Sequence, residues 1–265
     1  MTFYQLINEN RCCRIINKIV ITLKTVKNYL VSFRDYIKYS KTDLISLCLY
    51  SGQKLTVRSN SVDAHDAVTV LSGQEYPYHL FKDILSSKAT IFDIGAHLGA
   101  FTLYIKAQLP NSYIYAFEPA SDNFLLLEKN VRQNKLINIK IFQKAVAANS
   151  GQVFLNTTGR DSNAYQLSAT GVAVSSVSLD DFLRTENITK IDLIKLDCEG
   201  SEYEILSNFK NINQVKAIIL EYHKQNSQFN SEYLINFLTN NNFSLQGRRD
   251  LRDKSRGILF FTNNK

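Results

Sequence analysis

Carboxylates, glycines and a histidine lie in four short stretches of this 265-residue sequence, and each stretch follows an apolar run. The first stretch holds Asp93, Gly95 and Gly99, after the apolar run 90–94 and before apolar residues at helical spacing. A glycine turn between a strand and a helix leaves backbone N–H groups facing the carboxyl end of the strand, where open α/β sheets bind nucleotides and related ligands. The pattern therefore predicts a ligand site at this turn.

The spacing of the two glycines limits the ligand. Gly95 and Gly99 form G-x-x-x-G, whereas a nicotinamide dinucleotide site needs G-x-G-x-x-G to bring a pyrophosphate onto the helix N-terminus. Asp93, two residues earlier, would repel a pyrophosphate but suits a ligand with a cationic amine, as S-adenosylmethionine has. An ordinary tight turn is the alternative, because glycines commonly mark turns.

The second stretch is Glu118 and Pro119, at the end of the next predicted strand. In a doubly wound sheet this strand lies beside the first, and a carboxylate there accepts hydrogen bonds from the ribose hydroxyls of an adenosine. Dinucleotide folds use a carboxylate in the same way, so Glu118 does not distinguish the two cofactors. A solvated loop carboxylate is the alternative for Glu118 alone.

Two further stretches follow later strands. Asp197 and Glu199 come after the apolar run 191–196, and strand alternation puts Lys195 on the same side as Asp197. An ionisable cluster at the carboxyl end of a central strand is a functional candidate, although Lys195 could simply pair with a carboxylate.

Glu221 and His223 form the fourth stretch, at the end of the predicted strand 217–222. Alternation puts both side chains on one side, next to the end of the strand that carries Asp197. Histidine is the side chain best suited to proton transfer near neutral pH, so His223 is a candidate base; a structural or solvated histidine is the alternative.

From residue 90 onward strand and helix patterns alternate, which is typical of a parallel sheet covered on both faces. The seven predicted strands are 90–94, 112–117, 139–142, 191–196, 217–222, 243–246 and 257–262. We expect the order 3-2-1-4-5-7-6, with the seventh strand antiparallel, because the short connection 247–256 is too short for a parallel crossover. Residues 152–156 and 172–177 are predicted to be additional strands around a polar loop.

The first 50 residues predict a basic helical extension, so we divide the chain into domains 1–50 and 51–265. Apolar residues at steps of three and four predict one amphipathic helix over 12–37: Cys12, Ile15, Ile16, Ile19, Leu23, Val26, Leu30, Phe33 and Ile37. We expect its apolar face to pack on its own domain or on a second copy in a homodimer. Peripheral contact of residues 12–38 with an anionic membrane or another partner is the alternative. Residues 54–58 predict a strand.

Composition excludes several other classes. No run of eighteen apolar residues occurs, and the N-terminus lacks a secretory h-region, which favours a cytoplasmic location. The spacing of the four cysteines fits neither a disulfide framework nor a zinc site. A net charge of +7 permits acidic partners, but part of it lies in the extension.

Taken together, the motifs resemble the FkbM-type S-adenosylmethionine-dependent methyltransferases. The resemblance covers roughly residues 55–262 and is carried by Ile91–Thr102, Phe117–Pro119, Leu179–Asp181, Ile191–Glu202 and Leu220–His223. It implies the α/β class I methyltransferase (Rossmann-like) fold, and O-methylation of hydroxyls in sugars, glycans or related metabolites. His97 departs from the family, which most often has asparagine at this position.

On this resemblance S-adenosylmethionine is the expected cofactor, and the acceptor is a small molecule or glycan. The residues expected to bind the cofactor are Asp93, Gly95, Ala96, His97, Gly99, Glu118, Pro119 and Asp197. Asp197 is also expected to position the reacting groups, His223 to remove the hydroxyl proton, and Glu221 or Glu199 to orient His223. A divalent metal at these carboxylates is an alternative that we do not predict. Loops 60–80 and 156–172 are expected to contact the acceptor.

Three other functions compete with this hypothesis. The missing G-x-G-x-x-G argues against an NAD-dependent dehydrogenase. A non-enzymatic interaction or membrane-surface protein that retained the fold would have no need of the glycines or of Glu118. A nucleic-acid methyltransferase fits the positive charge, but no Asn-Pro-Pro-Tyr-like motif for a flipped base occurs, so we expect no nucleic acid partner.

Overall fold

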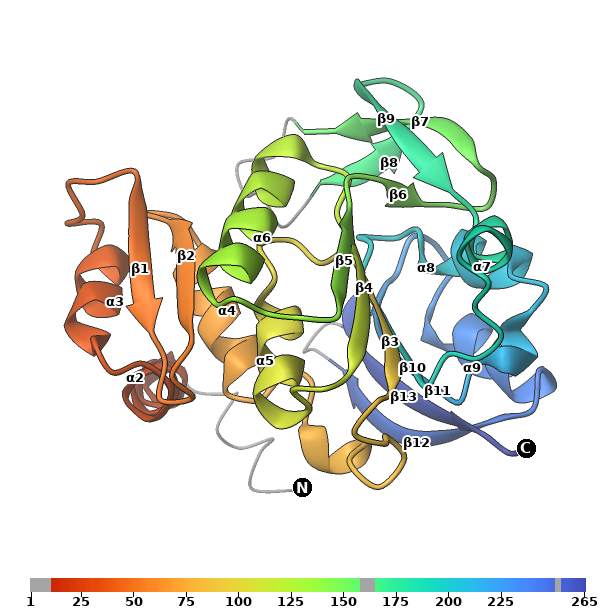
Figure 1. The fold of residues 1–265 in the computed structure, drawn as a ribbon, viewed down its shortest axis with the longest axis horizontal. Coiled ribbons are helices and arrows are strands. Elements are labelled where there is room, and N and C mark those ends of the chain that lie inside the picture. Colours follow the sequence, from red (N-terminus) through yellow and green to blue (C-terminus); the bar gives the residue numbers. More distant parts are fainter. Residues whose placement is uncertain (1–10, 158–164, 251–253) are drawn as a thin grey trace.

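The computed structural model describes residues 11–157, 165–250 and 254–265, and its centre is a seven-stranded sheet (Figure 1). The strands are β3 (Thr90–Ile94), β4 (Tyr113–Phe117), β5 (Ile139–Phe142), β10 (Leu193–Leu196), β11 (Ala217–His223), β12 (Phe243–Asp250) and β13 (Arg256–Asn263). Their order is β5-β4-β3-β10-β11-β13-β12, and β13 is antiparallel to both of its neighbours. This confirms the predicted order 3-2-1-4-5-7-6 and the antiparallel seventh strand.

Helices cover both faces of this sheet, as the alternating pattern predicted. The helices are α5 (Ala100–Gln108), α6 (Ser121–Gln133), α7 (Leu179–Glu186), α8 (Glu202–Asn208) and α9 (Ser231–Asn240). Alternate side chains of the strands enter two apolar clusters, one built with α7, α8 and α9 and the other with α5 and α6. All four residues of β10 are buried, which is why its sequence is a continuous apolar run interrupted only by Lys195.

A second, four-stranded sheet lies between β5 and α7 in the chain, at the top of Figure 1. It contains β6 (Ala145–Val146), β7 (Gly151–Asn156), β8 (Gln166–Ser168) and β9 (Val172–Val177), in the order β6-β9-β7-β8. The predicted strands 152–156 and 172–177 are therefore confirmed. No sequence pattern indicated β6 and β8, which are only two and three residues long.

The N-terminal part of the chain folds as a helical and β-hairpin unit. Its elements are α2 (Arg11–Thr25), α3 (Tyr29–Tyr36), β1 (Leu44–Cys48), β2 (Lys54–Arg58) and α4 (Asp63–Leu71), followed by a short 3-10 helix, Tyr78–Leu80. The predicted strand 54–58 is confirmed, and β1 pairs with β2 across residue 50. The proposed division at residue 50 thus falls in the turn of a hairpin, and the domain boundary itself stays a prediction.

The prediction of a single helix over 12–37 is wrong, because α2 ends at Thr25 and α3 begins at Tyr29, with a break at Val26. Val26 forms a β-bridge with Leu49, and the N–H of Lys27 donates to the carbonyl of Cys48 at 2.7 Å. The Asn28 side chain accepts from the N–H of Cys48 at 2.7 Å. These contacts come from residues about twenty positions later in the chain, so helical periodicity could not reveal them.

Asn130 of α6 joins this N-terminal unit to the sheet domain. The Asn130 side chain is buried, accepts from the N–H of Thr56 at 2.7 Å and donates to the carbonyls of Thr56 (2.9 Å) and Leu98 (2.8 Å). One amide therefore links β2, α6 and the glycine turn. Among the described residues, none forms a helix long and apolar enough to cross a membrane.

Candidate active site

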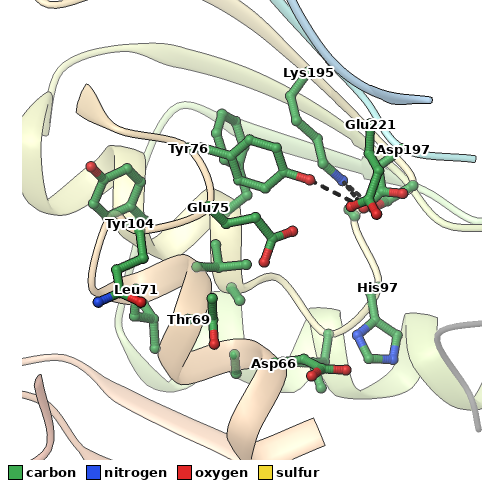
Figure 2. Close-up of a pocket in the computed structure, with 18 of the residues that line it drawn as sticks. Asp66, Thr69, Leu71, Glu75, Tyr76, His97, Tyr104, Lys195, Asp197 and Glu221 are labelled. Carbon is green, nitrogen blue, oxygen red and sulfur yellow. Dashed lines mark hydrogen bonds and ion pairs between the residues drawn. The ribbon is translucent and has the colours of Figure 1, made fainter. Parts of the chain in front are cut away.

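A cavity of about 1280 Å³ opens at the carboxyl ends of β3, β4, β10 and β11. Its lining includes His97, Glu118 and Pro119 at the strand ends and residues of α2 and α4 from the N-terminal unit. Figure 2 shows the part of the cavity where Glu75, Asp197 and Glu221 converge. Of the predicted site residues, the cavity is lined by Gly95, Ala96, His97, Glu118, Pro119, Asp197, Glu199 and Glu221.

Gly95 shapes the turn after β3. Its φ is +74°, and an added β-carbon would lie 1.8 Å from the backbone oxygen of Asp197. The N–H groups of Gly95 and Ala96 donate to the carbonyl of Phe117 at 3.0 and 2.9 Å. Only glycine can bring the turn this close to the end of β10, so the ends of three strands meet at one point.

Gly99 has a supporting place in the fold. It precedes α5 with a φ of +90°, and an added β-carbon would lie 2.8 Å from Cδ1 of Leu127 on α6. Gly99 does not line the cavity. Its predicted contact with a cofactor stays untested, and its evident role is close packing of α5 against α6.

Glu118 is a buried carboxylate that faces the glycine turn. It accepts hydrogen bonds from the N–H of His97 (2.8 Å), the N–H of Ala120 (3.0 Å) and the side-chain amide of Asn123 (3.3 Å). Burial raises the pKa of Glu118 to about 7, against the lowering effect of these hydrogen bonds. Three of about four acceptor positions on the carboxylate are taken, so at least one remains for a ligand hydroxyl.

His97 adopts a left-handed backbone conformation, with φ of +51°. Asparagine and histidine both tolerate this region better than most residues, so the exchange for the family's usual asparagine preserves the turn. Burial lowers the pKa of His97 to about 4, with Asp63 opposing and Arg58 adding to the effect. The ring is therefore neutral at pH 7, and Nε2 accepts from the Arg58 guanidinium at 3.2 Å, because a guanidinium can only donate.

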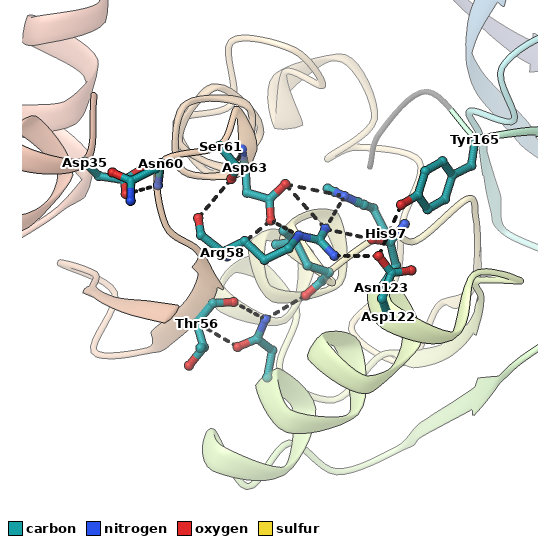
Figure 3. Close-up of polar contacts among 12 residues, drawn as sticks. Asp35, Thr56, Arg58, Asn60, Ser61, Asp63, His97, Asp122, Asn123 and Tyr165 are labelled. Atoms are coloured by element: carbon teal, nitrogen blue, oxygen red, sulfur yellow. Dashed lines mark hydrogen bonds and ion pairs between the residues drawn. The ribbon is translucent and has the colours of Figure 1, made fainter. Parts of the chain in front are cut away.

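Arg58 connects the N-terminal unit to Asn123 on α6 (Figure 3). Its guanidinium donates to Oδ2 of the fully buried Asp63 at 2.8 Å and to Oδ1 of Asn123 at 2.7 Å. Asn123 in turn donates to Glu118. At the exposed end the guanidinium lies 3.2 Å from Asp122, which also accepts from Tyr165 at 3.2 Å. The sequence did not indicate this network, because its members lie far apart in the chain.

Lys195 lines the cavity and forms a buried charge pair with Asp93, which lies behind it. Nζ of Lys195 donates to the carbonyl of Gly95 at 2.6 Å and lies 3.5 Å from Asp93 and 3.7 Å from Asp197. Burial disfavours the Lys195 charge, but the two aspartates outweigh it and hold the pKa of Lys195 above its usual range. Asp93 is fully buried, accepts from the Thr102 hydroxyl at 2.7 Å and does not line the cavity. Its predicted contact with a cofactor stays untested.

Asp197, Glu221 and Glu75 form an acidic cluster in the cavity wall (Figure 2), with one oxygen of each within 4.8 Å of the others. The Tyr76 hydroxyl donates to Asp197 at 3.2 Å. Burial and then the Asp197 charge raise the pKa of Glu75 to about 7 and that of Glu221 to about 8. Glu75 was missed from the sequence, because segment 44–80 shows no periodicity that would place it at the sheet.

His223 lies behind this cluster and does not line the cavity. Its Nε2 lies 3.3 Å from Glu199 and 3.7 Å from Glu221, and its Nδ1 lies 3.4 Å from Glu202. Burial lowers the pKa of His223, but Glu202, Glu199 and Asp197 outweigh burial and raise it to about 9. The imidazole is therefore protonated at pH 7. Its predicted role as a base stays untested, and these surroundings oppose it.

Two sets of described residues have the spacing of metal ligands: Asp197 with Glu202 and His223, and Glu75 with Asp197 and Glu221. Neither is the set Asp197, Glu199 and Glu221 that the sequence offered as an alternative. The expectation that no metal takes part stays untested. Segment 60–80, predicted as an acceptor loop, contains α4 and a 3-10 helix instead, but several of its residues between Val62 and Tyr76 do line the cavity. From the predicted loop 156–172, Tyr165 and Leu167 line the cavity, and 158–164 lie outside the described residues.

Comparison with known families agrees with this geometry. A model of the methyltransferase FkbM domain matches residues 93–245, which is more than half of the chain. The chain belongs to the FkbM methyltransferase family.

Three curated relatives are similar to parts of this chain. Methyltransferase sdnD of Sordaria araneosa is 29% identical over 46% of this chain and 61% of its own length. The 31-O-demethyl-FK506 methyltransferase FkbM of Streptomyces tacrolimicus is 25% identical over 50% of this chain and 65% of its own length. The hexuronic acid methyltransferase AglP of Haloferax volcanii is 22% identical over 75% of this chain and 84% of its own length. The chain thus spans less than two thirds of sdnD and FkbM.

Among solved structures, a putative rRNA methylase from Clostridium thermocellum has a TM-score of 0.46 at 11% identity, over 70% of this chain and 92% of its own. A likeness this distant adds nothing to what the strand order already shows.

Proposed function

We propose that this protein transfers a methyl group from S-adenosylmethionine to a hydroxyl of a sugar, glycan or related metabolite. One observation carries the proposal: Glu118 and the acidic cluster lie in one cavity and are joined by the turn 95–97. The turn donates to Glu118 at its far end and touches Asp197 at its near end. Family membership and the names of the relatives support the same activity.

The residues present fit this cofactor. Gly95 leaves room where a β-carbon would clash, and Glu118 is a carboxylate with acceptor capacity towards ribose hydroxyls. The carboxylates of Asp197, Glu221 and Glu75 suit a ligand that carries positive charge. Bound S-adenosylmethionine supplies an electrophilic methyl group on a sulfonium. In our proposal Gly95, Ala96, His97, Glu118 and Pro119 bind it, and Asp197 faces its charged end.

The acidic cluster also offers a proton acceptor. A general base works best when its pKa lies near the working pH, and the pKa values of about 7 for Glu75 and about 8 for Glu221 meet that condition. Asp197 accepts a hydrogen bond from Tyr76 and lies near Lys195. Asp197 is therefore assigned to positioning the reacting groups and not to proton transfer. We therefore assign proton removal to Glu221, assisted by Glu75, and give the protonated His223 the task of orienting Glu221 and Glu199.

We place the acceptor end of the cavity at α2 and α4, where the wall is polar. This wall includes Asn17, Lys18, His65 and Gln74. A surface with several donors and acceptors suits a ligand with many hydroxyls, because each buried hydroxyl needs a hydrogen-bond partner. The relatives named as acting on a hexuronic acid and on 31-O-demethyl-FK506 support a hydroxyl acceptor.

Calorimetry with S-adenosylhomocysteine tests the cofactor site. We expect micromolar binding by the full chain, and at least about tenfold weaker binding by Glu118→Gln, since a buried acceptor of charge-assisted hydrogen bonds is lost. Glu128→Gln, at an exposed position of α6, the helix that follows Glu118, is the matched control and should bind S-adenosylhomocysteine as the unaltered chain does. Absence of binding by the unaltered chain would contradict the proposal.

Incubation with methyl-labelled S-adenosylmethionine and a panel of hexuronic acids, neutral sugars and hydroxylated metabolites tests the acceptor. We expect label on an oxygen of one class and none after Glu221→Gln. Label on nitrogen, carbon or nucleic acid would overturn the assignment of a hydroxyl acceptor while leaving cofactor binding intact.

A further inference from the structure

The outward face of α2 is apolar and unusually exposed. Five apolar side chains on it are between 38% and 59% exposed: Ile15, Ile16, Ile19, Val20 and Leu23. Their spacing puts all five on one side of the helix. The opposite side, with Ile21 and Thr22 buried, belongs to the face that packs towards α4.

This arrangement contradicts one of the packings expected from the sequence, burial of the apolar face on the chain's own domain, and leaves packing on a second copy untested. Six of the nine apolar residues of the predicted helix are exposed: Ile15, Ile16, Ile19, Leu23, Leu30 and Ile37. Scattered exposed apolar residues are common, but a continuous exposed apolar helix face marks a contact surface. No described residue buries this face.

The exposed charged residues on α2, on α3 and in the segment that follows up to residue 42 all have one sign, and the first exposed carboxylate after them is Asp43. Between residues 15 and 42 the exposed charged residues are Lys24, Lys27, Arg34, Lys38 and Lys41. The one acidic residue in that range, Asp35, is buried at 2% exposure and binds the N–H of Asn60 at 2.6 Å. The exposed surface of α2 and α3 is therefore apolar and cationic, with no compensating carboxylate among these residues.

We propose that α2 and α3 dock this protein on an anionic lipid bilayer. The apolar side chains would enter the boundary between headgroups and acyl chains, and the lysines and Arg34 would lie among anionic headgroups. A second copy fits less well, because a two-fold interface sets each surface against itself and would bring these cations together. Charge complementarity thus favours the bilayer.

The docking face borders the candidate active site. Val20 and Lys24 lie at the edge of the apolar face and also line the cavity, together with Asn17 and Lys18. Docking would therefore hold the acceptor end of the cavity near the lipid surface. The proposal rests on α2 and α3 alone and stands whether or not the acceptor is a sugar.

Vesicle sedimentation with the full chain tests the proposal. Vesicles of phosphatidylcholine with phosphatidylglycerol should pellet the protein, and vesicles of phosphatidylcholine alone should pellet at least about tenfold less. About 0.5 M NaCl should release much of the bound protein, because salt screens exposed charges. Equal pelleting by both vesicles, or none by either, would overturn the proposal.

Two variant pairs identify the face. Ile16→Asn with Ile19→Asn removes apolar area, and Lys27→Glu with Arg34→Glu reverses charge; each pair should weaken vesicle binding at least about tenfold. The matched control is Leu125→Asn with Lys129→Glu on α6, where Leu125 is 60% exposed against 59% for Ile16. The control should bind like the unaltered chain.

Sedimentation velocity without lipid completes the test. We expect a monomer whose mass is unchanged by Ile16→Asn. A dimer that this substitution dissociates would overturn the proposal in favour of a second copy on the same face. Unchanged vesicle binding in both variant pairs would also overturn it, provided that circular dichroism shows them folded.

Discussion

The backbone oxygen of Asp197 lies 1.8 Å from the point where a β-carbon on residue 95 would stand. The turn after β3 and the end of β10 are thus in direct backbone contact, and the N–H groups of the same turn bind the end of β4. This backbone contact between residue 95 and Asp197 fixes the candidate cofactor residues relative to the acidic cluster. Any side chain at residue 95 must separate the strand ends.

Gly95→Ala should therefore abolish binding of S-adenosylhomocysteine and destabilise the fold by more than about 2 kcal/mol, because a steric clash adds to the backbone strain of a positive φ. Gly52→Ala is the matched control, since Gly52 has a φ of +91° with nothing within 4 Å of an added β-carbon. The control should lose only about 1 kcal/mol, from backbone strain alone. Urea unfolding and calorimetry measure both, and equal losses in the two variants would contradict the steric argument.

Local patterns predicted the sheet because its residues obey local rules. The buried residues of β10 form an apolar run, and the short connection before β13 permits only an antiparallel return. The turn at Gly95 could be predicted in the same way, because a glycine between a strand pattern and a helix pattern commonly marks a turn. These features depend on near neighbours in the sequence.

Features that depend on distant contacts were not predictable. The break at Val26 arises from its pairing with Leu49, and Glu75 reaches the cluster only because α4 packs on α5. His223 was placed correctly beside Glu221, but its protonation depends on Glu202, a residue that sequence alone presented as a helix-start charge. The position of a side chain such as His223 can be predicted from the strand pattern, whereas its pKa depends on groups that only the folded chain brings next to it.

The pH dependence of turnover distinguishes Glu221 from His223 as the base. A base must be deprotonated, so kcat/KM should rise with pH and level off above about pH 8, following the pKa of about 8 at Glu221. His223→Gln removes a positive charge that lowers the Glu221 pKa, so the rise should move to higher pH while activity at its plateau persists.

Glu221→Gln should lower kcat by about 10²- to 10⁴-fold and remove this rise. If His223 were the base, His223→Gln would instead cause the large loss at every pH. Affinity for S-adenosylhomocysteine serves as the control and should stay within about twofold in His223→Gln, because His223 does not line the cavity.

Arg58 should act on cofactor affinity without touching the cofactor, since Asn123 lies between Arg58 and Glu118. Arg58→Met should weaken S-adenosylhomocysteine binding by about 5- to 30-fold, because the Asn123 amide loses a charge-assisted hydrogen bond. Arg58→Lys should recover part of the loss. Asp122→Asn, which removes a carboxylate that is 53% exposed and pairs with the same guanidinium, should change binding less than about threefold. A purely structural role for Arg58 would lower stability but leave the affinity of the folded protein unchanged.

Lys195 and Asp93 should be strongly coupled in stability, because both are buried and each is within 3.5 Å of the other. Lys195→Met leaves the Asp93 carboxylate without its counter-charge and should cost about 3–5 kcal/mol. Asp93→Asn keeps an acceptor for the Thr102 hydroxyl, so it should cost less. In the double variant no charge is left at either position, and the loss should fall short of the summed single losses by about 0.5–3 kcal/mol. Urea unfolding of the four proteins gives this coupling energy, and strictly additive losses would show that the pair does not hold the base of the cavity together.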